Sequence, residues 1–301
     1  MAISGVSTNS IFQSTINDMA RTMGRLSDLQ TQLSSGRKSD NFSGIAANAA
    51  QLLNLDTQLS KADQYITNNT LAIARLDTTN DSLNQIISVA TSLKGLIANR
   101  RSGVTSVGFD IQLQAQWKAL TAALNRTSNG SYVFSGTATD TPAVDSSTFP
   151  RLTSTGEVDS GYYQGSYQDI VHRAQDGVQF TANVRGNDPA FEAIFAGLAT
   201  AQDAQITGDD AKFQAAYNSI EEGLQNVITI QATVNANKVN LSDTNTTLKS
   251  TKVYWQELRD EISNTDLLAV STQVAVDQGI LQAAFQAFAK INALKLSDYL
   301  R

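Results

Sequence analysis

The sequence predicts a mainly α protein: an elongated, discontinuous bundle of long coiled-coil-like helices from both termini, with a small inserted antiparallel β domain. Two observations predict this fold. Apolar residues recur at alternating steps of three and four over both flanks, which is the repeat of long packed helices. All three prolines (Pro142, Pro150 and Pro189) lie in the middle third, where glycine and tyrosine are also concentrated. A turn-rich centre between two helical flanks is typical of an inserted domain.

The chain opens with an amino-terminal assembly helix, expected over residues 1–44. Its apolar residues step by 4, 3, 4, 3 and 7, and Gln30 occupies the skipped position. These residues are Phe12, Ile16, Met19, Met23, Leu26 and Leu33. The repeat breaks at Ser34-Ser35-Gly36 and again at Asn41-Phe42-Ser43-Gly44.

A helical rod is expected next, with its first half over residues 45–131. Its seam alternates by three and four through Leu52, Leu55, Leu59, Ala62, Ile66, Asn69, Ile73, Leu76, Asn80, Leu83, Ile87, Ala90, Lys94 and Ile97. A repeat of this length predicts a rod about 70 Å long, at about 1.5 Å per residue. The polar members Asn69, Asn80 and Lys94 are expected to cost stability while fixing the register. A shorter helix from Ile111 to Leu124 follows and is expected to return antiparallel.

The centre, residues 132–190, alternates in short stretches separated by glycine-rich turns, which predicts an inserted β-rich domain. The second half of the rod follows over residues 191–263, with a seam at Phe213, Tyr217, Ile220, Leu224, Val227, Gln231, Val234, Lys238 and Leu241 that continues at Leu248, Trp255 and Ile262. A carboxyl-terminal assembly helix is expected over 264–301. Asp266 can cap it, because its carboxylate can accept from the first free backbone N–H groups.

The two end helices need partners. Ordering roughly 35 residues costs about 1–2 kcal/mol per residue, whereas each buried apolar side chain returns only about 1.5–3 kcal/mol. Both ends also carry apolar residues off their main seams, and a helix that is apolar on two faces is buried on two faces. We therefore expect the ends to pair with each other and then to pack among copies. The expected assembly interface is Ile11, Phe12, Ile16, Met19, Met23, Leu26, Leu33, Val270, Val274, Leu281, Phe285, Phe288, Ile291, Leu296 and Tyr299.

Composition argues against several other classes. The chain has no cysteine, one histidine and a net charge of −6. It therefore offers no thiolate metal site, little choice of imidazole base and no basic stripe for nucleic acid. We expect no catalytic, cofactor-binding or metal-binding residues and no enzyme activity; His172 is expected to be a half-buried or surface histidine. The first twenty residues lack a Sec signal pattern, and no apolar run is long enough for membrane insertion.

Several segments resemble a known group of proteins. Asn9, Leu26 to Leu33, and the run Leu33-Ser34-Ser35-Gly36-Arg37-Lys38-Ser39-Asp40 resemble the amino-terminal region of bacterial flagellins. Within that group, further segments resemble the flagellar hook-associated protein 3 family. These are Gly130-Ser131-Tyr132-Val133-Phe134-Ser135-Gly136-Thr137, Tyr163-Gln164-Gly165, Asn187-Asp188-Pro189-Ala190-Phe191 and the carboxyl end from Ala287 to Leu300.

The resemblance implies a structural subunit of the bacterial flagellum at the hook–filament junction. Such a subunit supports motility and is exported unfolded by the type III apparatus with a chaperone, without a Sec signal. Its implied partners are other copies of itself in a ring, hook-associated protein 1 and flagellin. Its terminal helices would form the inner layer, with the β domain outside, in the extracellular flagellum. No cofactor is implied.

Three alternatives stay open at this point. The Leu300-Arg301 terminus is more like that of flagellin, so the chain can also be read as a flagellin filament subunit. A secreted coiled-coil adhesin would tolerate loss of the ends. An enzyme housed in the β insertion would need a concave site with convergent polar groups, and residues 132–190 contain no motif that announces one.

Overall fold

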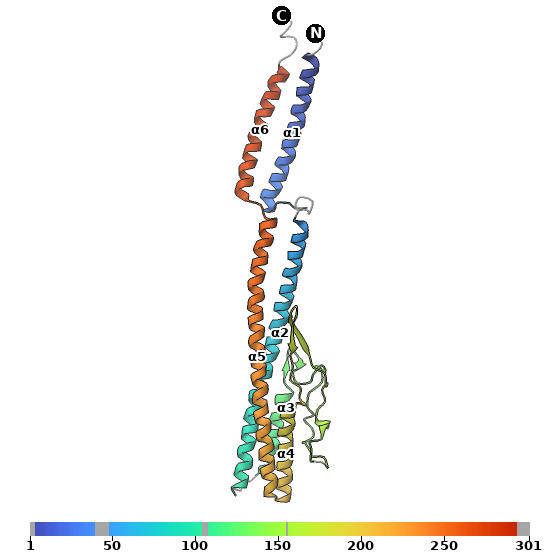
Figure 1. Cartoon of the computed structure of the whole chain (residues 1–301), viewed down its shortest axis with the longest axis vertical. Coiled ribbons are helices and arrows are strands. Elements are labelled where there is room, and N and C mark those ends of the chain that lie inside the picture. Colours follow the sequence, from blue (N-terminus) through green and yellow to red (C-terminus); the bar gives the residue numbers. More distant parts are fainter. Residues whose placement is uncertain (1–3, 40–47, 104–107, 155, 294–301) are drawn as a thin grey trace. The chain divides into compact units, whose positions relative to one another are not determined.

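The computed structural model describes residues 4–39, 48–103, 108–154 and 156–293; the side chains of 4–9, 11 and 291–293 fall outside this description. The helices are α1 (Ser4–Ser35), α2 (Ala49–Arg101), α3 (Phe109–Leu124), α4 (Pro189–Thr207), α5 (Asp210–Ser263) and α6 (Leu267–Ala293) (Figure 1). The strands are β1 (Thr127–Ser128), β2 (Ser131–Tyr132), β3 (Val171–Gln175) and β4 (Val178–Thr181). The predicted fold class, mainly α with long helices and a small antiparallel β region, is confirmed.

The chain divides into two compact units. One is built from residues up to 60 together with those from 251 onward, and it contains α1 and α6. The other is built from residues 61–250. The predicted division into five segments at 44, 131, 190 and 263 stays a prediction.

The long heptad seams are confirmed. All fourteen predicted positions on α2 are buried or half-buried, and so are the twelve on α5. The two lysines of the seams have partners within residues 61–250: Lys94 forms an ion pair with Glu221, and Lys238 forms one with Asp77. Each charge in these seams is therefore offset by an opposite charge on the facing long helix.

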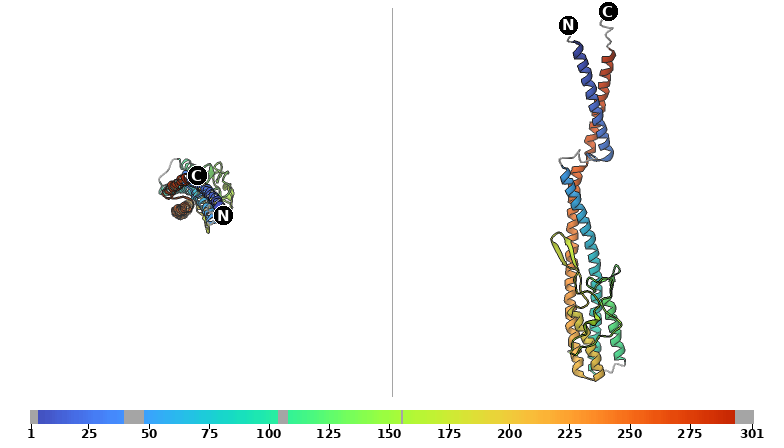
Figure 2. Two further views of the ribbon diagram at one scale, coloured as in Figure 1. Left: turned by 90° about the horizontal axis from the view of Figure 1, so that it is seen from above. Right: turned by 90° about the vertical axis from the view of Figure 1, so that its right-hand side faces the viewer.

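The core of residues 61–250 is a bundle of α3 and α4 with the adjoining parts of α2 and α5 (Figure 2). Aromatic rings pack edge to face in it: the ring centroids of Phe109 and Phe213 lie 5.7 Å apart, and those of Trp117 and Phe195 lie 5.4 Å apart. The sequence pattern did not separate α4 from the second half of the rod. Gly208, at φ +69°, ends α4, and the carboxylate of Asp209 accepts from Ala211 N to start α5.

Glycines let α4 and α5 approach closely. A Cβ atom placed on Gly223 would lie 2.7 Å from the carbonyl oxygen of Ala190 and 2.6 Å from Cγ1 of Ile194. Backbone atoms cannot move aside cheaply, so any side chain at this position must push the two helices apart.

Gly223→Ala is therefore expected to lower the free energy of unfolding by about 1–3 kcal/mol, the usual cost of overpacking. Urea denaturation followed by circular dichroism measures it. The matched control is Gly95→Ala on α2, where an added Cβ meets nothing within 4 Å. That substitution should be neutral or stabilising, because alanine favours helix over glycine. Equal destabilisation by both substitutions would contradict the packing argument.

The β region is small, as the fold class predicts. It consists of two separate two-stranded antiparallel ladders, β1–β2 and β3–β4, the first of which begins at Thr127. Asn129 and Gly130, both at positive φ, make the two-residue turn of the first hairpin, as two-residue hairpin turns require. Much of the chain between the ladders is irregular and includes the short 3-10 helix η2 (Ser160–Tyr162).

The segments of the middle of the chain that resemble the flagellar family, together with the residues next to them, lie close together in space. Ser166 N donates to Ser135 O at 2.9 Å, and Gly186 N donates to Phe134 O at 2.7 Å. A Cβ on Gly165 would lie 2.8 Å from Cα of Ser135, so only glycine allows this approach. The ring of Phe134 packs edge to face on Phe191, at a centroid distance of 5.7 Å. These segments therefore form one packed junction at the base of the β region.

Candidate assembly surface

The two end helices pair antiparallel. The ring centroids of Phe12 and Phe288 lie 4.9 Å apart at one end of the pair. Further along, Arg25 of α1 bonds Asp277 of α6, and near the other end Thr265 Oγ1 donates to Gln32 Oε1 at 3.4 Å. The expected pairing of the ends with each other is confirmed, and Figure 1 shows α1 and α6 side by side.

Backbone bonds beside the pair fix how α1 meets α6. Gly36, at φ +70°, ends α1, and its carbonyl accepts from Thr265 N at 2.9 Å. Lys38 N donates to Ser263 O at 2.8 Å. The predicted cap is confirmed, because the carboxylate of Asp266 accepts from Leu268 N at 2.9 Å and starts α6.

The predicted apolar stripe of α1 divides into two stripes. The residues that face α6 are buried or half-buried and step by three and four; they are Phe12, Thr15, Met19, Thr22, Leu26 and Leu29. Three of the predicted residues are exposed: Ile16 by 38% and Met23 by 45%, both beside this stripe, and Leu33 by 41%, four residues beyond Leu29 at the end of the stripe. The pair of helices therefore leaves a second apolar stripe of α1 open.

On α6 the inward stripe is Val270, Val274, Asp277, Leu281, Ala284 and Phe288, all buried or half-buried. Phe285, one of the predicted interface residues, lies beside this stripe and is 47% exposed, and Ile280 is 48% exposed. The side chains of Ile11 and Ile291, and all of Leu296 and Tyr299, lie outside the described residues. That the predicted residues contact neighbouring subunits stays a prediction.

Arg25 and Asp277 are the residues that the sequence reading missed. The Asp277 side chain is fully buried, and its two oxygens accept from Arg25 Nε at 2.6 Å and Arg25 Nη2 at 3.1 Å. Gln273 Nε2 donates to the same carboxylate at 2.9 Å. These hydrogen bonds, those of Arg25 foremost, lower the pKa of Asp277 below its ordinary value, and the same pair raises the pKa of Arg25. Two nitrogens of Arg25 bond two oxygens of Asp277, so the pair fixes the relative orientation of the two side chains as well as stabilising their contact.

Acid is expected to loosen this pair of helices. The folded-state pKa of Asp277 lies below that of the unfolded chain, so its contribution is fully present at neutral pH and is lost as pH falls below about 4. Hydrogen exchange of α6 amides, corrected for intrinsic rates, should accelerate in that range. Asp277→Asn should remove this step. A step of the same size in the variant would show that another group causes it.

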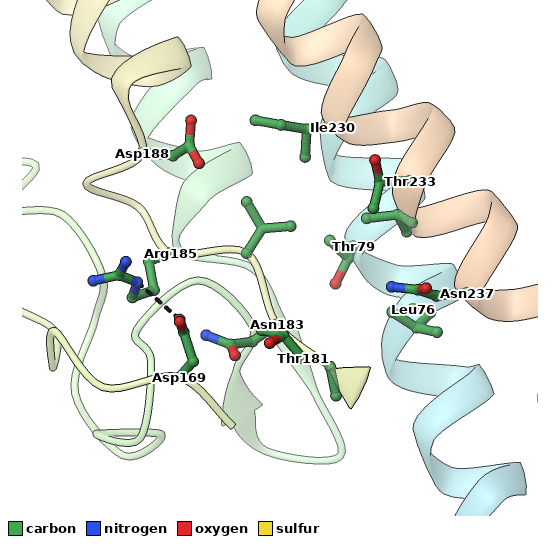
Figure 3. Close-up of a pocket in the computed structure, with 13 residues that line it drawn as sticks. Leu76, Thr79, Asp169, Thr181, Asn183, Arg185, Asp188, Ile230, Thr233 and Asn237 are labelled. Carbon is green, nitrogen blue, oxygen red and sulfur yellow. Dashed lines mark ion pairs between the residues drawn. The ribbon is translucent and has the colours of Figure 1, made fainter. Parts of the chain in front are cut away.

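A cavity of about 270 Å³ lies between α2, α5 and the segment that leads into α4 (Figure 3). Its charged groups already have partners. Arg185 Nε lies 2.9 Å from Asp169 Oδ1, and Asp188 caps α4 by accepting from Ala190 N at 3.0 Å. The lining supplies no histidine, lysine or tyrosine. The arrangement is therefore that of a packing cavity between the β region and the long helices.

His172 belongs to a hydrogen-bond network centred on Asn69. Asn69 is fully buried; its Nδ2 donates to Ala174 O and to Asn245 Oδ1, both at 3.0 Å. Its Oδ1 therefore accepts from His172 Nε2 at 2.7 Å. Burial lowers the pKa of His172, which keeps the ring neutral at pH 7. This network joins α2, β3 and α5, and it explains how a polar Asn69 is accommodated in the seam.

Within the described part of the chain, no three His, Asp or Glu side chains gather closely enough to hold a metal ion. Among the same residues, none of the helices has both the length and the apolar character needed to cross a bilayer.

Comparisons with known proteins agree with the helical architecture. Residues 6–139 match the family model of the bacterial flagellin N-terminal helical region. No curated protein matches the chain. The solved structure of a "putative flagellar hook-associated protein from Vibrio parahaemolyticus" is 18% identical, with a TM-score of 0.57 over 73% of this chain and 100% of that chain. A crystal structure of Bacillus cereus FlgL is 17% identical, with a TM-score of 0.50 over 65% of this chain and 98% of that chain. The chain is therefore flagellin-like: its amino-terminal helical region matches that of bacterial flagellins, and its fold is similar to that of flagellar hook-associated proteins.

Proposed function

We propose that this protein is a structural subunit of the bacterial flagellum and forms the hook–filament junction, between the hook-associated protein 1 ring and flagellin. The observation that carries the proposal is the fold similarity, which extends over the whole of the solved Vibrio parahaemolyticus chain. The flagellin-like region at residues 6–139 supports the same role. As such a subunit it acts outside the cell in support of motility and reaches its place by type III export with a chaperone.

The paired end helices support an assembly role. Both helices keep large apolar side chains in water after pairing: Ile16, Met23, Leu33, Leu268, Val276, Ile280 and Phe285. Apolar groups concentrated in this way on one pair of helices favour contact with further protein. Copies of the chain arranged in a ring would bury them, each pair of ends packing on the next.

The main competing function is a flagellin filament subunit, which the flagellin-like amino-terminal region also favours. Purified protein added to hook-associated protein 1 and short flagellar seeds distinguishes the two. A junction subunit should stop at short rings or oligomers that then accept flagellin. Continuous growth of long filaments from the protein alone would overturn the junction role and favour the filament role.

A secreted coiled-coil adhesin is a weaker alternative. It predicts that removal of residues 281–301 leaves activity intact, because binding would not depend on the end helices. The junction proposal predicts loss of assembly and of motility in the same deletion. Normal motility in cells with the deletion would contradict the junction proposal.

A further inference from the structure

A groove of about 630 Å³ opens within residues 61–250, along one face of α2. The α2 residues that line it run from Lys61 to Arg75 at helical spacing. The turn of the β1–β2 hairpin adds Asn129, and the β3–β4 hairpin adds His172 and Arg173. Three separate elements thus converge on one hollow of the size of a small-molecule site.

The charge of this groove differs from that of the chain as a whole. Lys61, Arg75 and Arg173 line it, and no Asp or Glu does, although the chain carries a net charge of −6. The carboxylate of Asp176, in the β3–β4 turn, borders the groove. It is 70% exposed, lies 4.0 Å from Lys61 Nζ and accepts from Tyr65 Oη at 2.6 Å. Asp176 pairs with Lys61, whereas the lining itself contains three cations and no carboxylate.

Arg75 is the most constrained of the three cations. Its Nη2 donates to the carbonyl oxygens of Tyr132 and Val133, at 3.0 and 3.3 Å. No carboxylate among the described residues pairs with it, and burial alone lowers its pKa. Burial of a guanidinium without an opposite charge costs free energy, and the two carbonyls offset only part of that cost. A bound anion would offset more of it by forming charge-assisted hydrogen bonds with Arg75.

We propose that this groove binds a small anionic polyol, a sugar that carries a carboxylate or a phosphate. Arginine is suited to both groups because its planar fork matches two oxygens at once. Asn68, Asn129 and Ser131 supply the donors and acceptors that sugar hydroxyls need, and Leu71 and Ile170 supply an apolar surface for the ring. This binding is independent of the proposed assembly role, since all of its residues lie within 61–250.

The full-length, unassembled protein tests the proposal with three probes: glucuronate, glucose 6-phosphate and glucose. His172 is the one histidine of the chain and lines the groove, so its ring protons give a single NMR reporter. We expect saturable shifts with glucuronate, glucose 6-phosphate or both, and none with glucose. The responding probe tells whether the anionic group is a carboxylate or a phosphate.

The double substitution Lys61→Gln/Arg173→Gln should weaken binding at least about tenfold, measured by isothermal titration calorimetry. The matched control is Lys118→Gln/Lys249→Gln, which changes the net charge equally at exposed lysines outside the groove. It should bind as the wild type does. Equal weakening in the control, an equal response to glucose, or no saturable binding of either anionic probe would each overturn the proposal.

Discussion

Phe285→Asp is expected to leave the free protein folded and to reduce its incorporation into flagellar assemblies at least about tenfold. Phe285 is 47% exposed on α6 and lies beside the stripe that faces α1, so the pair of end helices loses little when it is replaced. In an apolar contact between subunits, however, an unpaired carboxylate would have to leave water, which costs about 2 kcal/mol or more. Motility, and the fraction of exported protein found in flagellar particles, measure the effect.

Phe288→Asp separates folding from assembly. The ring of Phe288 contacts that of Phe12, at a centroid distance of 4.9 Å, so this substitution should loosen the α1–α6 pair as well as block assembly. Circular dichroism of the two free variants should show lost helix and a lower melting temperature for Phe288→Asp alone.

The control for both variants is Gln286→Asp, which adds the same charge at an exposed polar position of α6. It should assemble normally. If Phe285→Asp also assembles normally, the exposed apolar face of α6 is not a subunit contact, and the interface proposed for α6 is wrong.

The long seams could be predicted because the rules behind them are local. A repeat of three and four places its residues on one side of a helix whatever the partner is. The end of α1 at Gly36 and the cap at Asp266 follow from backbone and side-chain chemistry within a few residues. Strand positions could not be read in the same way, because strands of two to five residues are too short for an alternating pattern to be recognised.

The sequence also could not show which of two adjacent stripes of α1 faces α6. The predicted stripe, with Ile16 and Met23, is more apolar than the stripe that faces α6, which contains Thr15 and Thr22. Which of two neighbouring stripes faces a partner depends on the partner's own shape and charge. One signal was present, since Asp277 falls on a seam position of α6, between Val274 and Leu281. A carboxylate on a seam calls for a cation, but Arg25 lies 252 residues away.

Replacing the buried carboxylate by an apolar side chain, as in Asp277→Leu, is expected to change assembly more than stability. Asp277 is fully buried, whereas Arg25 is 52% exposed and can return to water when its partner is lost. Leucine also suits the apolar seam. We therefore expect the α1–α6 pair of Asp277→Leu to melt no lower than that of the wild type, since apolar replacements of buried ion pairs are often neutral or stabilising. Asp277→Asn keeps a polar group in the seam without the charge, so it should melt lower than both.

The same substitution should turn α1 about its axis. Arg25 and Met23 lie about 160° apart around the helix, at about 3.6 residues per turn. Holding Arg25 toward Asp277 therefore keeps Met23 pointing away from α6, where it is 45% exposed. Without the pair, the more apolar stripe can rotate inward, which would hide Ile16 and Met23 from neighbouring subunits. We expect Asp277→Leu to assemble poorly despite its stability. Ile16 and Met23 would then face α6 within the monomer and could not contact neighbouring subunits.

Methionine oxidation measures this rotation directly. In the wild type, hydrogen peroxide should oxidise exposed Met23 faster than half-buried Met19, which serves as an internal reference on the same helix. In Asp277→Leu the ratio of the two rates should fall, while Asp277→Asn should keep the wild-type ratio because its seam still holds a polar group. An unchanged ratio in Asp277→Leu would mean that packing alone orients α1. The buried ion pair would then not decide which face of α1 is open for assembly.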